Sequence, residues 1–286
     1  MDNWDDLRFL VALSKTGTMT AAAKHLGTNT ATVSRRIERL SEQLGTPAFV
    51  KTSDGWKPSD AVLKLIEISQ AFDGTLQSVI NTHVQTLSNE PVHLNLGCIP
   101  IVSSQVLFPG LKRRADMLKG ISITFSDRVF REGLGENDLV IMYGQPDSGR
   151  IVTRKAGQLG FRLWRFRDAD SDDQWAGLTE AHDDYPPMQM GLKRFAGPPK
   201  IRVDSFVALY SLMQLTRLPG PLPEVLAAQD PSLVPVEPGA APFAADFWLM
   251  FHETRRSDPA MRAVVEWVTA CFEDVAQHEA QVAQAS

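Results

Sequence analysis

A run of small, hydroxyl-bearing and basic side chains lies between residues 30 and 57. Its members are Thr30, Ala31, Thr32, Ser34, Arg35, Arg39, Lys51 and Lys57. Small and hydroxyl-bearing side chains can approach the edges of nucleic-acid bases closely, while Arg and Lys side chains reach bases or phosphates. Residue types of this kind predict contact with a nucleic acid. Whether they act together depends on the elements that hold them.

Two short helical patterns separated by a tight break would position the first six of these residues. In the first pattern, apolar residues recur at the spacing of one helix face: Met19, Ala22, Ala23 and Leu26. Thr18 is a suitable N-cap, and Gly27 suits the left-handed residue at the helix end. Asn29 is a second candidate cap, and the helix after it has the apolar stripe Val33, Ile37, Leu40 and Leu44.

The second predicted helix carries a polar face opposite its apolar stripe. At about 100° per residue, the side chains facing away are Ala31, Ser34, Arg35 and Glu38, with Thr30, Thr32 and Arg39 on the flanks. This arrangement is typical of a helix-turn-helix, whose second helix enters the major groove. The alternative is an ordinary helical hairpin whose charged face is merely solvated.

The residues that follow favour the helix-turn-helix. Ser53-Asp54-Gly55 is a turn signal between two short extended pieces, which predicts a small hairpin. We expect Phe49 and Trp56 to fold back on the helices and to leave Lys51 and Lys57 outside. The hairpin would then be a wing with two lysines directed at phosphates.

Residues 4–59 resemble the N-terminal winged helix-turn-helix of LysR-type transcriptional regulators. The matching segments are Leu7–Leu13, Gly17–Leu26, Val33–Leu40, Leu44-Gly45 and Phe49–Thr52. Three places depart from the family pattern: Thr30-Ala31 stands where Gln-Pro is common, Ser41 where Glu is usual, and Ala48 where Leu is usual. The fold assignment survives these changes, but the preference for a DNA sequence is not transferred from any relative.

A long helical pattern begins at Ser59 and runs to about Leu87 without a proline. Its apolar seam is close to heptad spacing and comprises Leu65, Phe72, Leu76, Val79, Ile80 and Leu87. A helix of this length with a single apolar seam needs a partner. In LysR-type proteins the equivalent linker helix pairs antiparallel across a dimer, and the resemblance implies the same here.

From Val92 onward, strand and helix patterns alternate, which predicts an α/β domain with a largely parallel sheet. The predicted strands are 92–96, 120–125, 139–143, 151–156, 161–166, 200–203 and 246–252, and the predicted helices are 104–118, 205–216 and one from 259. The segment 164–190 fits no clear pattern. The resemblance implies a periplasmic-binding-protein-like effector domain of two Rossmann-like subdomains.

The predicted organisation has three parts. An all-α winged helix-turn-helix domain covers residues 1–58, a linker and dimerisation helix covers 59–90, and the effector domain covers 91–286. Subdomain I would comprise about 91–160 and 249–286, and subdomain II about 161–248.

A ligand of this second domain would bind beyond the carboxyl ends of strands and beside helix N-termini. The residues at three such points are Ile99, Pro100, Ser103, Ser104, Ser126, Asp127, Asp204, Ser205 and Phe206. The alternative is that Ser104 and either Asp204 or Ser205 are plain helix caps, and one residue can serve both roles. Ile99 stands where relatives often have Ser or Thr, so an apolar or aromatic effector is as credible as an anion.

Composition limits the other possibilities. The 286 residues are 43 % hydrophobic and carry a net charge of −5, which argues against a protein that coats nucleic acid non-specifically. No membrane span or signal peptide is evident, so we expect a cytoplasmic protein. Cys98 and Cys271 are interpreted as small buried residues rather than as a redox switch. No metal-ligand spacing, phosphate loop or nucleophile motif is present, and no cofactor is expected.

These observations predict a DNA-binding transcriptional regulator that senses a small molecule bound between two subdomains. The resemblance implies double-stranded operator DNA and a second copy of the chain as partners, in a homodimer or homotetramer, with RNA polymerase as a candidate further partner. One alternative is a regulator without an effector. An α/β enzyme fused to a DNA-binding domain is less favoured, because the sequence offers no nucleophile–base pair.

Overall fold

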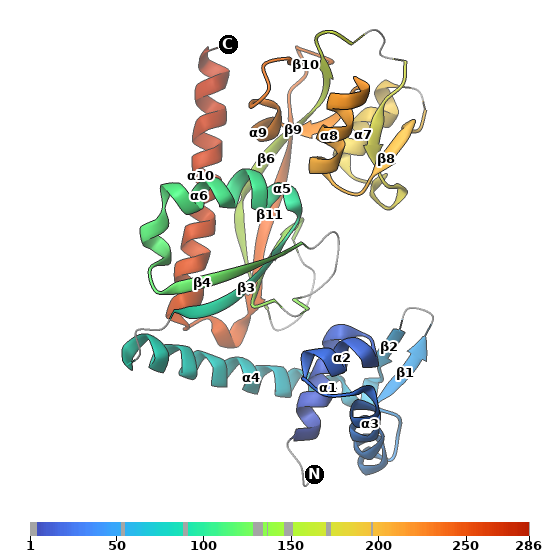
Figure 1. Cartoon of the computed structure of the whole chain (residues 1–286), viewed down its shortest axis with the longest axis vertical. Helices are drawn as coiled ribbons and strands as arrows, with labels where there is room; N and C mark the ends of the chain where they lie inside the picture. The colour runs from blue at the N-terminus through green and yellow to red at the C-terminus, as the bar shows by residue number, and fades with distance from the viewer. Residues whose placement is uncertain are drawn as a thin grey trace.

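The computed structural model describes residues 5–52, 55–87, 91–127, 134–135, 137–145, 151–169, 173–195 and 197–285. The first elements form a small N-terminal domain (Figure 1): α1 (Asp5–Thr16), α2 (Met19–His25), α3 (Thr30–Leu44), β1 (Phe49–Thr52) and β2 (Gly55–Pro58). Strands β1 and β2 pair antiparallel, so both the helical pair and the hairpin are confirmed. The predicted turn residues 53–54 and boundary residues 89–90 lie outside the described residues.

Short-range signals in the sequence start and end these helices. The Thr18 hydroxyl accepts a hydrogen bond from the Ala21 N–H at 3.1 Å, and the Asn29 amide oxygen accepts one from the Thr32 N–H at 2.8 Å. Each cap satisfies a backbone donor that the first turn of a helix leaves without an intrahelical partner. Gly45 follows α3 with a φ of 68°, a left-handed conformation that glycine adopts without steric cost.

The apolar stripe of α3 is buried against α1 and α2, as Val33, Ile37 and Leu40 show. Leu44 is 38 % exposed, so the prediction that it belongs to the buried stripe is wrong. Helix α3 ends at this residue, and the core beyond it is completed by Ala48 and Phe49 of the following segment. The stripe therefore needs only three residues of α3.

Helix α4 (Asp60–Leu87) joins the small domain to the rest of the chain. Leu65 packs against the core of the small domain, so it is not part of an exposed seam. Beyond it the helix exposes a row of large apolar side chains: Ile68, Phe72, Leu76, Val79 and Ile80. The predicted seam is thus confirmed from Phe72 to Ile80, while the side chain of Leu87 lies outside the described residues.

The C-terminal part is built on a mixed seven-stranded sheet, in the order β10-β6-β11-β5-β3-β4 with β9 also paired to β6. The strands are β3 (Val92–Cys98), β4 (Ile121–Asp127), β5 (Leu139–Tyr143), β6 (Ile151–Phe166), β9 (Gly220–Pro223), β10 (Leu233–Pro235) and β11 (Phe243–His252). Strand β3 is parallel to β4 and β5, whereas β11 is antiparallel to β5 and β6. Strands β7 (Ala176–Leu178) and β8 (Ile201–Val203) form a separate parallel pair.

The long strands β6 and β11 run side by side through the whole C-terminal part (Figure 1). We call β3, β4 and β5 with their helices the inner half, which lies next to α4, and β7 to β10 with their helices the outer half. The prediction of two strands at 151–156 and 161–166 is wrong, because β6 is continuous over 16 residues. Strand β11 also begins three residues before the predicted 246.

The helices cover the sheet on both sides. They are α5 (Pro100–Val102), the π-helix η1 (Ser103–Leu107), α6 (Phe108–Arg113), α7 (Pro186–Arg194), α8 (Phe206–Thr216), α9 (Glu224–Ala227) and α10 (Pro259–Ala285). The predicted single helix 104–118 is wrong in its bounds: helical structure begins at Pro100, whose fixed φ suits the first helical position, and α6 ends at Arg113. The unassigned segment 164–190 contains β7 and the start of α7.

Candidate nucleic-acid interface and ligand cleft

The first turns of α3 present three predicted contact residues to solvent. Thr30 and Ala31 are the first two residues of the helix, and Arg35 follows just over one turn later; all three are exposed. Among the residues that the structure describes, Arg35 makes no hydrogen bond or ion pair. Because nothing in the described chain occupies this guanidinium, it is available for a base or a phosphate.

Two further hydroxyls on α3 have local partners. The Thr32 hydroxyl donates to the Asn29 amide oxygen at 3.0 Å, and the Ser34 hydroxyl donates to a Glu38 carboxylate oxygen at 2.8 Å. Both hydroxyl oxygens keep lone pairs with which to accept a hydrogen bond. Thr32 and Ser34 are therefore held by neighbours on the same helix or at its cap, and could still accept a hydrogen bond. Their contact with DNA remains a prediction.

Arg39 differs from Arg35 because it is tied to α1. Its Nε donates to Asp6 Oδ2 at 2.9 Å, and a second N–H of the same guanidinium donates to Asp6 Oδ1. Arg36 donates to the same carboxylate at 3.0 Å, and the Asp6 side chain has no exposed surface. These hydrogen bonds raise the pKa of the Arg39 guanidinium. Arg39 thus fixes α3 against α1, while 41 % of its side chain remains exposed.

Sequence reasoning missed the part played by Asp6. It lies in the first turn of α1, where a carboxylate is favoured by the helix dipole alone. The signal that could have identified Asp6 is its position next to Leu7 on the buried side of α1. A buried carboxylate needs a partner for its charge.

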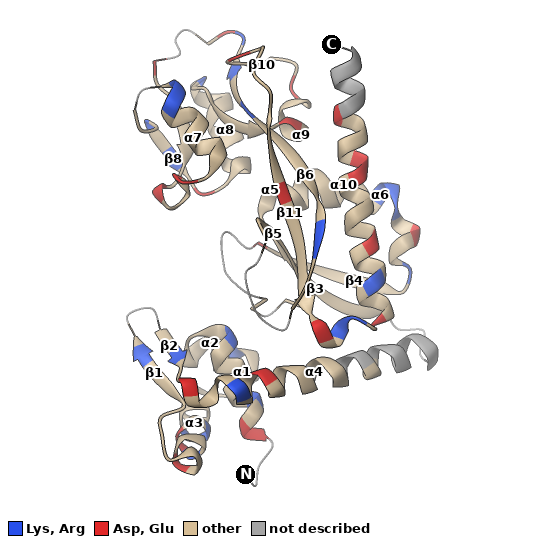
Figure 2. Ribbon diagram, turned by 180° about the vertical axis from the view of Figure 1, so that it is seen from behind, with Lys and Arg blue, Asp and Glu red and all other residues tan. Residues whose placement is uncertain are grey.

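The wing holds its two lysines on the outside, as predicted. Lys51 on β1 and Lys57 on β2 are exposed, and both strands show basic positions in Figure 2. Phe49 is buried and Trp56 packs against the same core. The backbone N–H of Trp56 donates to the Gly17 carbonyl at 2.8 Å, which anchors the wing to the turn between α1 and α2.

The structure brings two of the three predicted ligand-contact points of the C-terminal part together. Strand β3 leads into Ile99 and Pro100, and β8 leads into Asp204 and Ser205; helices α5 and α8, which follow them, are in contact. The third point is adjacent in the sheet, because Asp127 pairs with the last residue of β3. Residues from both halves therefore meet at these strand ends.

The hydroxyls at these ends have local roles. The Ser205 hydroxyl caps α8 by accepting from the Ala208 N–H at 3.3 Å, and the buried Ser103 hydroxyl donates to the Pro100 carbonyl at 3.0 Å. Ser104, which is half-buried, accepts from the Gln105 amide at 3.4 Å. Ser205 is the cap that the alternative interpretation expected.

The remaining predicted contacts are polar or aromatic. The Ser126 hydroxyl donates to the Asn137 amide oxygen at 2.6 Å, and Asp127 and Asp204 are exposed. Phe206 is buried, with its ring centroid 5.1 Å from that of Phe161.

Two features near these strand ends were not predicted. Ser103–Leu107 adopts a π-helix, a rare form that often accompanies functional sites. The rings of Tyr143, at the end of β5, and Tyr185, before α7, lie 5.2 Å apart and so join the two halves. Burial raises the pKa of Tyr185 to about 12, so both rings are neutral at physiological pH. The sequence signal was weak, since each tyrosine also fits a strand end or a loop.

Both cysteines are buried and free, as interpreted from the sequence. Burial raises the pKa of Cys98 and of Cys271 to about 12, which suppresses the thiolate. Within the described part of the chain, no group of three or more His, Cys, Asp or Glu residues is placed to hold a metal ion. No helix over the described ranges is long and apolar enough to cross a membrane.

Comparisons with known proteins agree with this geometry. Residues 4–62 match the family described as the bacterial regulatory helix-turn-helix protein, lysR family. Residues 4–62 therefore carry a LysR-type helix-turn-helix domain. A domain of this family is the DNA-binding domain of regulators of transcription, as the resemblance in the first sixty residues predicted.

Similar proteins span nearly the whole chain. The Mau operon transcriptional activator of Paracoccus denitrificans is 24 % identical over 277 residues, which cover 94 % of this chain and 96 % of that protein. The structures of a full-length OxyR variant from Pseudomonas aeruginosa and of ArgP from Mycobacterium tuberculosis each share 16 % identity with this chain. Both cover 95 % of this chain and 98 % of theirs, with TM-scores of 0.63 and 0.64. These two structures confirm the predicted LysR regulator fold, a helical DNA-binding domain followed by an α/β domain.

Proposed function

We propose that this LysR-type regulator binds operator DNA as a homodimer and that a small molecule held between the inner and outer halves controls it. The observation that carries the DNA-binding part is the exposed start of α3, with Thr30, Ala31 and the unpaired Arg35, set beside two exposed wing lysines. The chain carries a net charge of −5, so DNA binding depends on this local basic surface.

The two sets of residues would act differently. Thr30, Ala31 and Arg35 lie at the start of α3, the part of a recognition helix that reads base edges. Lys51 and Lys57 on the wing would contact phosphates, which position the protein without reading sequence. The backbone N–H groups in the first turn of α3 would add a further site for a phosphate.

A second copy of the chain would cover the exposed seam of α4. Phe72 and Val79 are 62 % and 63 % exposed, which is unusual for large apolar residues on one helix. Pairing of this seam would set two DNA-binding domains at half-sites one or more helical turns of DNA apart. The tetramer and contact with RNA polymerase remain predictions.

The organisation into 1–58, 59–90 and 91–286, with its two subdomains, is part of this proposal. Strands β6 and β11 support it, because they connect the inner half to the outer half. An effector at the strand ends would touch Ser104 in one half and Ser205 in the other, and would so bias their relative orientation. None of the nine predicted contact residues is a Lys or Arg, which favours an apolar or aromatic effector over a simple anion.

Selection of random duplex DNA by the full chain tests the proposed function. We expect enriched sequences with two related half-sites spaced by one or more helical turns. A pool that shows no enrichment after repeated rounds would contradict it.

The effector part has its own test. Metabolites that raise the melting temperature of the full chain are selected, and their effect on operator binding is measured with the parent and with Ser205→Trp. Lost response together with intact basal DNA binding supports the cleft. A full response from Ser205→Trp would place the effector elsewhere.

A further inference from the structure

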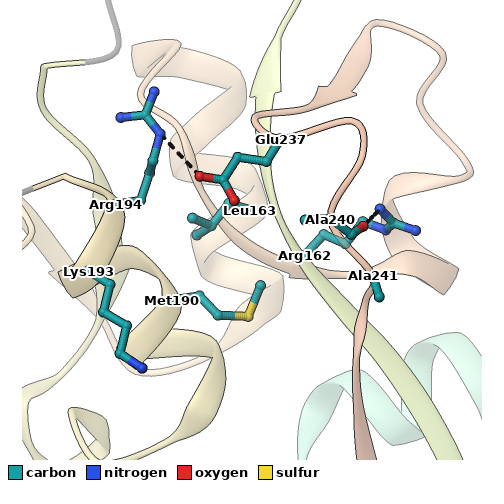
Figure 3. A pocket seen from close by; sticks show the side chains of 8 residues that line it. All are labelled: Arg162, Leu163, Met190, Lys193, Arg194, Glu237, Ala240 and Ala241. Carbon is teal, nitrogen blue, oxygen red and sulfur yellow. Dashed lines mark hydrogen bonds and ion pairs between the residues drawn. The ribbon is translucent and has the colours of Figure 1, made fainter.

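The outer half contains a cavity of about 340 Å³ that takes no part in the functions argued above. Figure 3 shows the residues that line it: Arg162, Leu163, Met190, Lys193, Arg194, Glu237, Ala240 and Ala241. None of them belongs to the predicted effector cleft at the strand ends. A volume in this range is sufficient for a small organic ligand.

The cavity arises where a loop leaves the sheet. Strand β10 pairs with residues 164–166 of β6, and β11 pairs with residues 151–161 of the same strand. The loop that connects β10 to β11 therefore separates from β6 beside Arg162 and Leu163. Arg162 donates to the Ala240 carbonyl of that loop and, at 2.7 Å, to Glu224 at the start of α9. Arg162 therefore ties this loop to β6 and to α9.

The walls combine apolar surface with cations. Leu163 is buried and Met190 is half-buried, so they give the cavity an apolar floor. Lys193 and Arg194, in the last turn of α7, are exposed at its rim. Among the described residues, the Lys193 ammonium has no hydrogen-bond or ion-pair partner.

The second cation has a weakly held partner. Arg194 Nε lies 3.5 Å from Glu237 Oε1, and the two side chains are 39 % and 56 % exposed. The same guanidinium lies 5.3 Å from the Phe195 ring centroid, which limits its orientation. An exposed ion pair of this kind contributes little to stability. A carboxylate from outside could replace Glu237 on Arg194 at little cost.

We propose that this cavity binds a small organic carboxylate with an apolar body. The carboxylate pairs with Arg194, and the apolar body lies against Leu163 and Met190. Lys193, whose side chain points away from Arg194 in Figure 3, adds positive charge at the rim. This site is separate from the proposed effector cleft and does not depend on it. Cations at the end of α7 also complement the helix dipole, but that role alone requires neither a cavity nor an apolar floor beside them.

Methyl NMR of the full chain labelled with ¹³C-methyl methionine tests the proposal, because Met190 lines the cavity. The labelled chain has nine methionines. The Met190 signal is assigned as the one that disappears in Met190→Leu. Hexanoate is titrated beside hexylamine and hexanol, which share its apolar chain. We expect the Met190 signal to move with hexanoate far more than with the other two.

Charge variants locate the carboxylate. Arg194→Gln should weaken hexanoate binding by about tenfold, since a lost charge-assisted hydrogen bond has this size of effect, and Lys193→Gln should weaken it less. Glu237→Gln should strengthen it, because it removes the competing carboxylate. Lys200→Gln is the matched control: Lys200 is exposed and does not line the cavity.

Two outcomes would overturn the proposal. One is a Met190 signal that moves equally with hexanoate, hexylamine and hexanol, which means apolar contact without charge recognition. The other is an unchanged hexanoate affinity in Arg194→Gln. Ser205→Trp should leave the Met190 response intact; loss of the response there would assign the ligand to the cleft between the halves and would likewise reject this site.

Discussion

Replacing Asn29 separates the stability of α3 from its contact with DNA. The Asn29 amide oxygen accepts hydrogen bonds from the Thr32 N–H at 2.8 Å and from the Thr32 hydroxyl at 3.0 Å. Asn29→Ala removes both, and loss of such a cap costs about 1 kcal/mol of helix stability. Asn29→Asp keeps the acceptor and adds a negative charge at the positive end of α3, which adds about 0.3–1 kcal/mol.

On DNA the order of the two variants reverses. The Asn29→Asp carboxylate would face the phosphates that the start of α3 approaches, so we expect a large loss of affinity and a smaller salt slope. Asn29→Ala keeps the net charge and should bind nearly as the parent does. The more stable variant is therefore the weaker binder.

Two measurements on the full chain determine the stability of α3 and the affinity for DNA. Amide hydrogen exchange in α3 should be about fivefold faster in Asn29→Ala, the equivalent of 1 kcal/mol. Fluorescence anisotropy at several salt concentrations gives DNA affinity. Gln43→Glu is the control, since it adds the same charge about 21 Å along the helix, beyond the screening length of salt. Parent-like affinity and salt slope for Asn29→Asp would refute the placement of α3 against DNA.

Three other changes test different parts of the structure. Leu76→Asp with Val79→Asp should give monomers by sedimentation, because both residues lie in the exposed seam of α4; an unchanged profile would reject that interface. Burial and the nearby Glu224 raise the pKa of Glu279 to about 7, so the folded state holds a proton that the unfolded state releases near pH 4.5. Stability should thus fall as pH rises from about 5 to 7.5, and Glu279→Gln should flatten that melting profile, whereas a parent-like profile would contradict the assignment. Cys98, whose pKa burial raises to about 12, should resist iodoacetamide at pH 8 until the chain unfolds; rapid labelling of the folded protein would show that the thiol is accessible.

The N-terminal domain could be predicted from sequence because its signals are local. Thr18, Gly27 and Asn29 act within three or four residues of their own positions, and the structure shows each cap or turn where it was expected. The pairing of Arg39 with Asp6 could not be predicted in this way. The two residues are 33 positions apart, and only the packing of α1 on α3 brings them together.

Strand β6 is continuous where two strands were predicted. Gly157 and Gly160 lie between the two predicted strands, and both serve close packing. A Cβ at Gly157 would lie 2.5 Å from the Phe272 side chain of α10, and one at Gly160 would collide with Glu224. Glycine marks a turn only where the backbone needs it; here its missing side chain lets a helix approach the sheet.

The candidate ligand-contact residues were predicted from one rule about strand ends, which depends on the sheet order rather than on local sequence. That rule selected Ser104 and Ser205 as candidates but could not select Tyr143 and Tyr185, because a ring contact between the two halves leaves no periodic trace in the sequence. The basic cavity beside α7 was missed for a related reason: Arg162 and Glu237 are 75 positions apart, and only the loop that leaves β6 brings them to one wall.

The most direct test of the central claim compares Arg35→Gln and Lys51→Gln on DNA selected by the parent chain. Lys51→Gln should weaken binding to all sequences alike and lower the salt slope by about one unit, as expected for a lost phosphate contact. Arg35→Gln should cost about 1–3 kcal/mol on the selected operator and relax the preference at one base position. Lys200→Gln, in the outer half, should leave affinity and preference unchanged. If Arg35→Gln and Lys51→Gln bind the operator with the affinity, salt slope and preference of the parent, DNA is not bound by α3 and the wing.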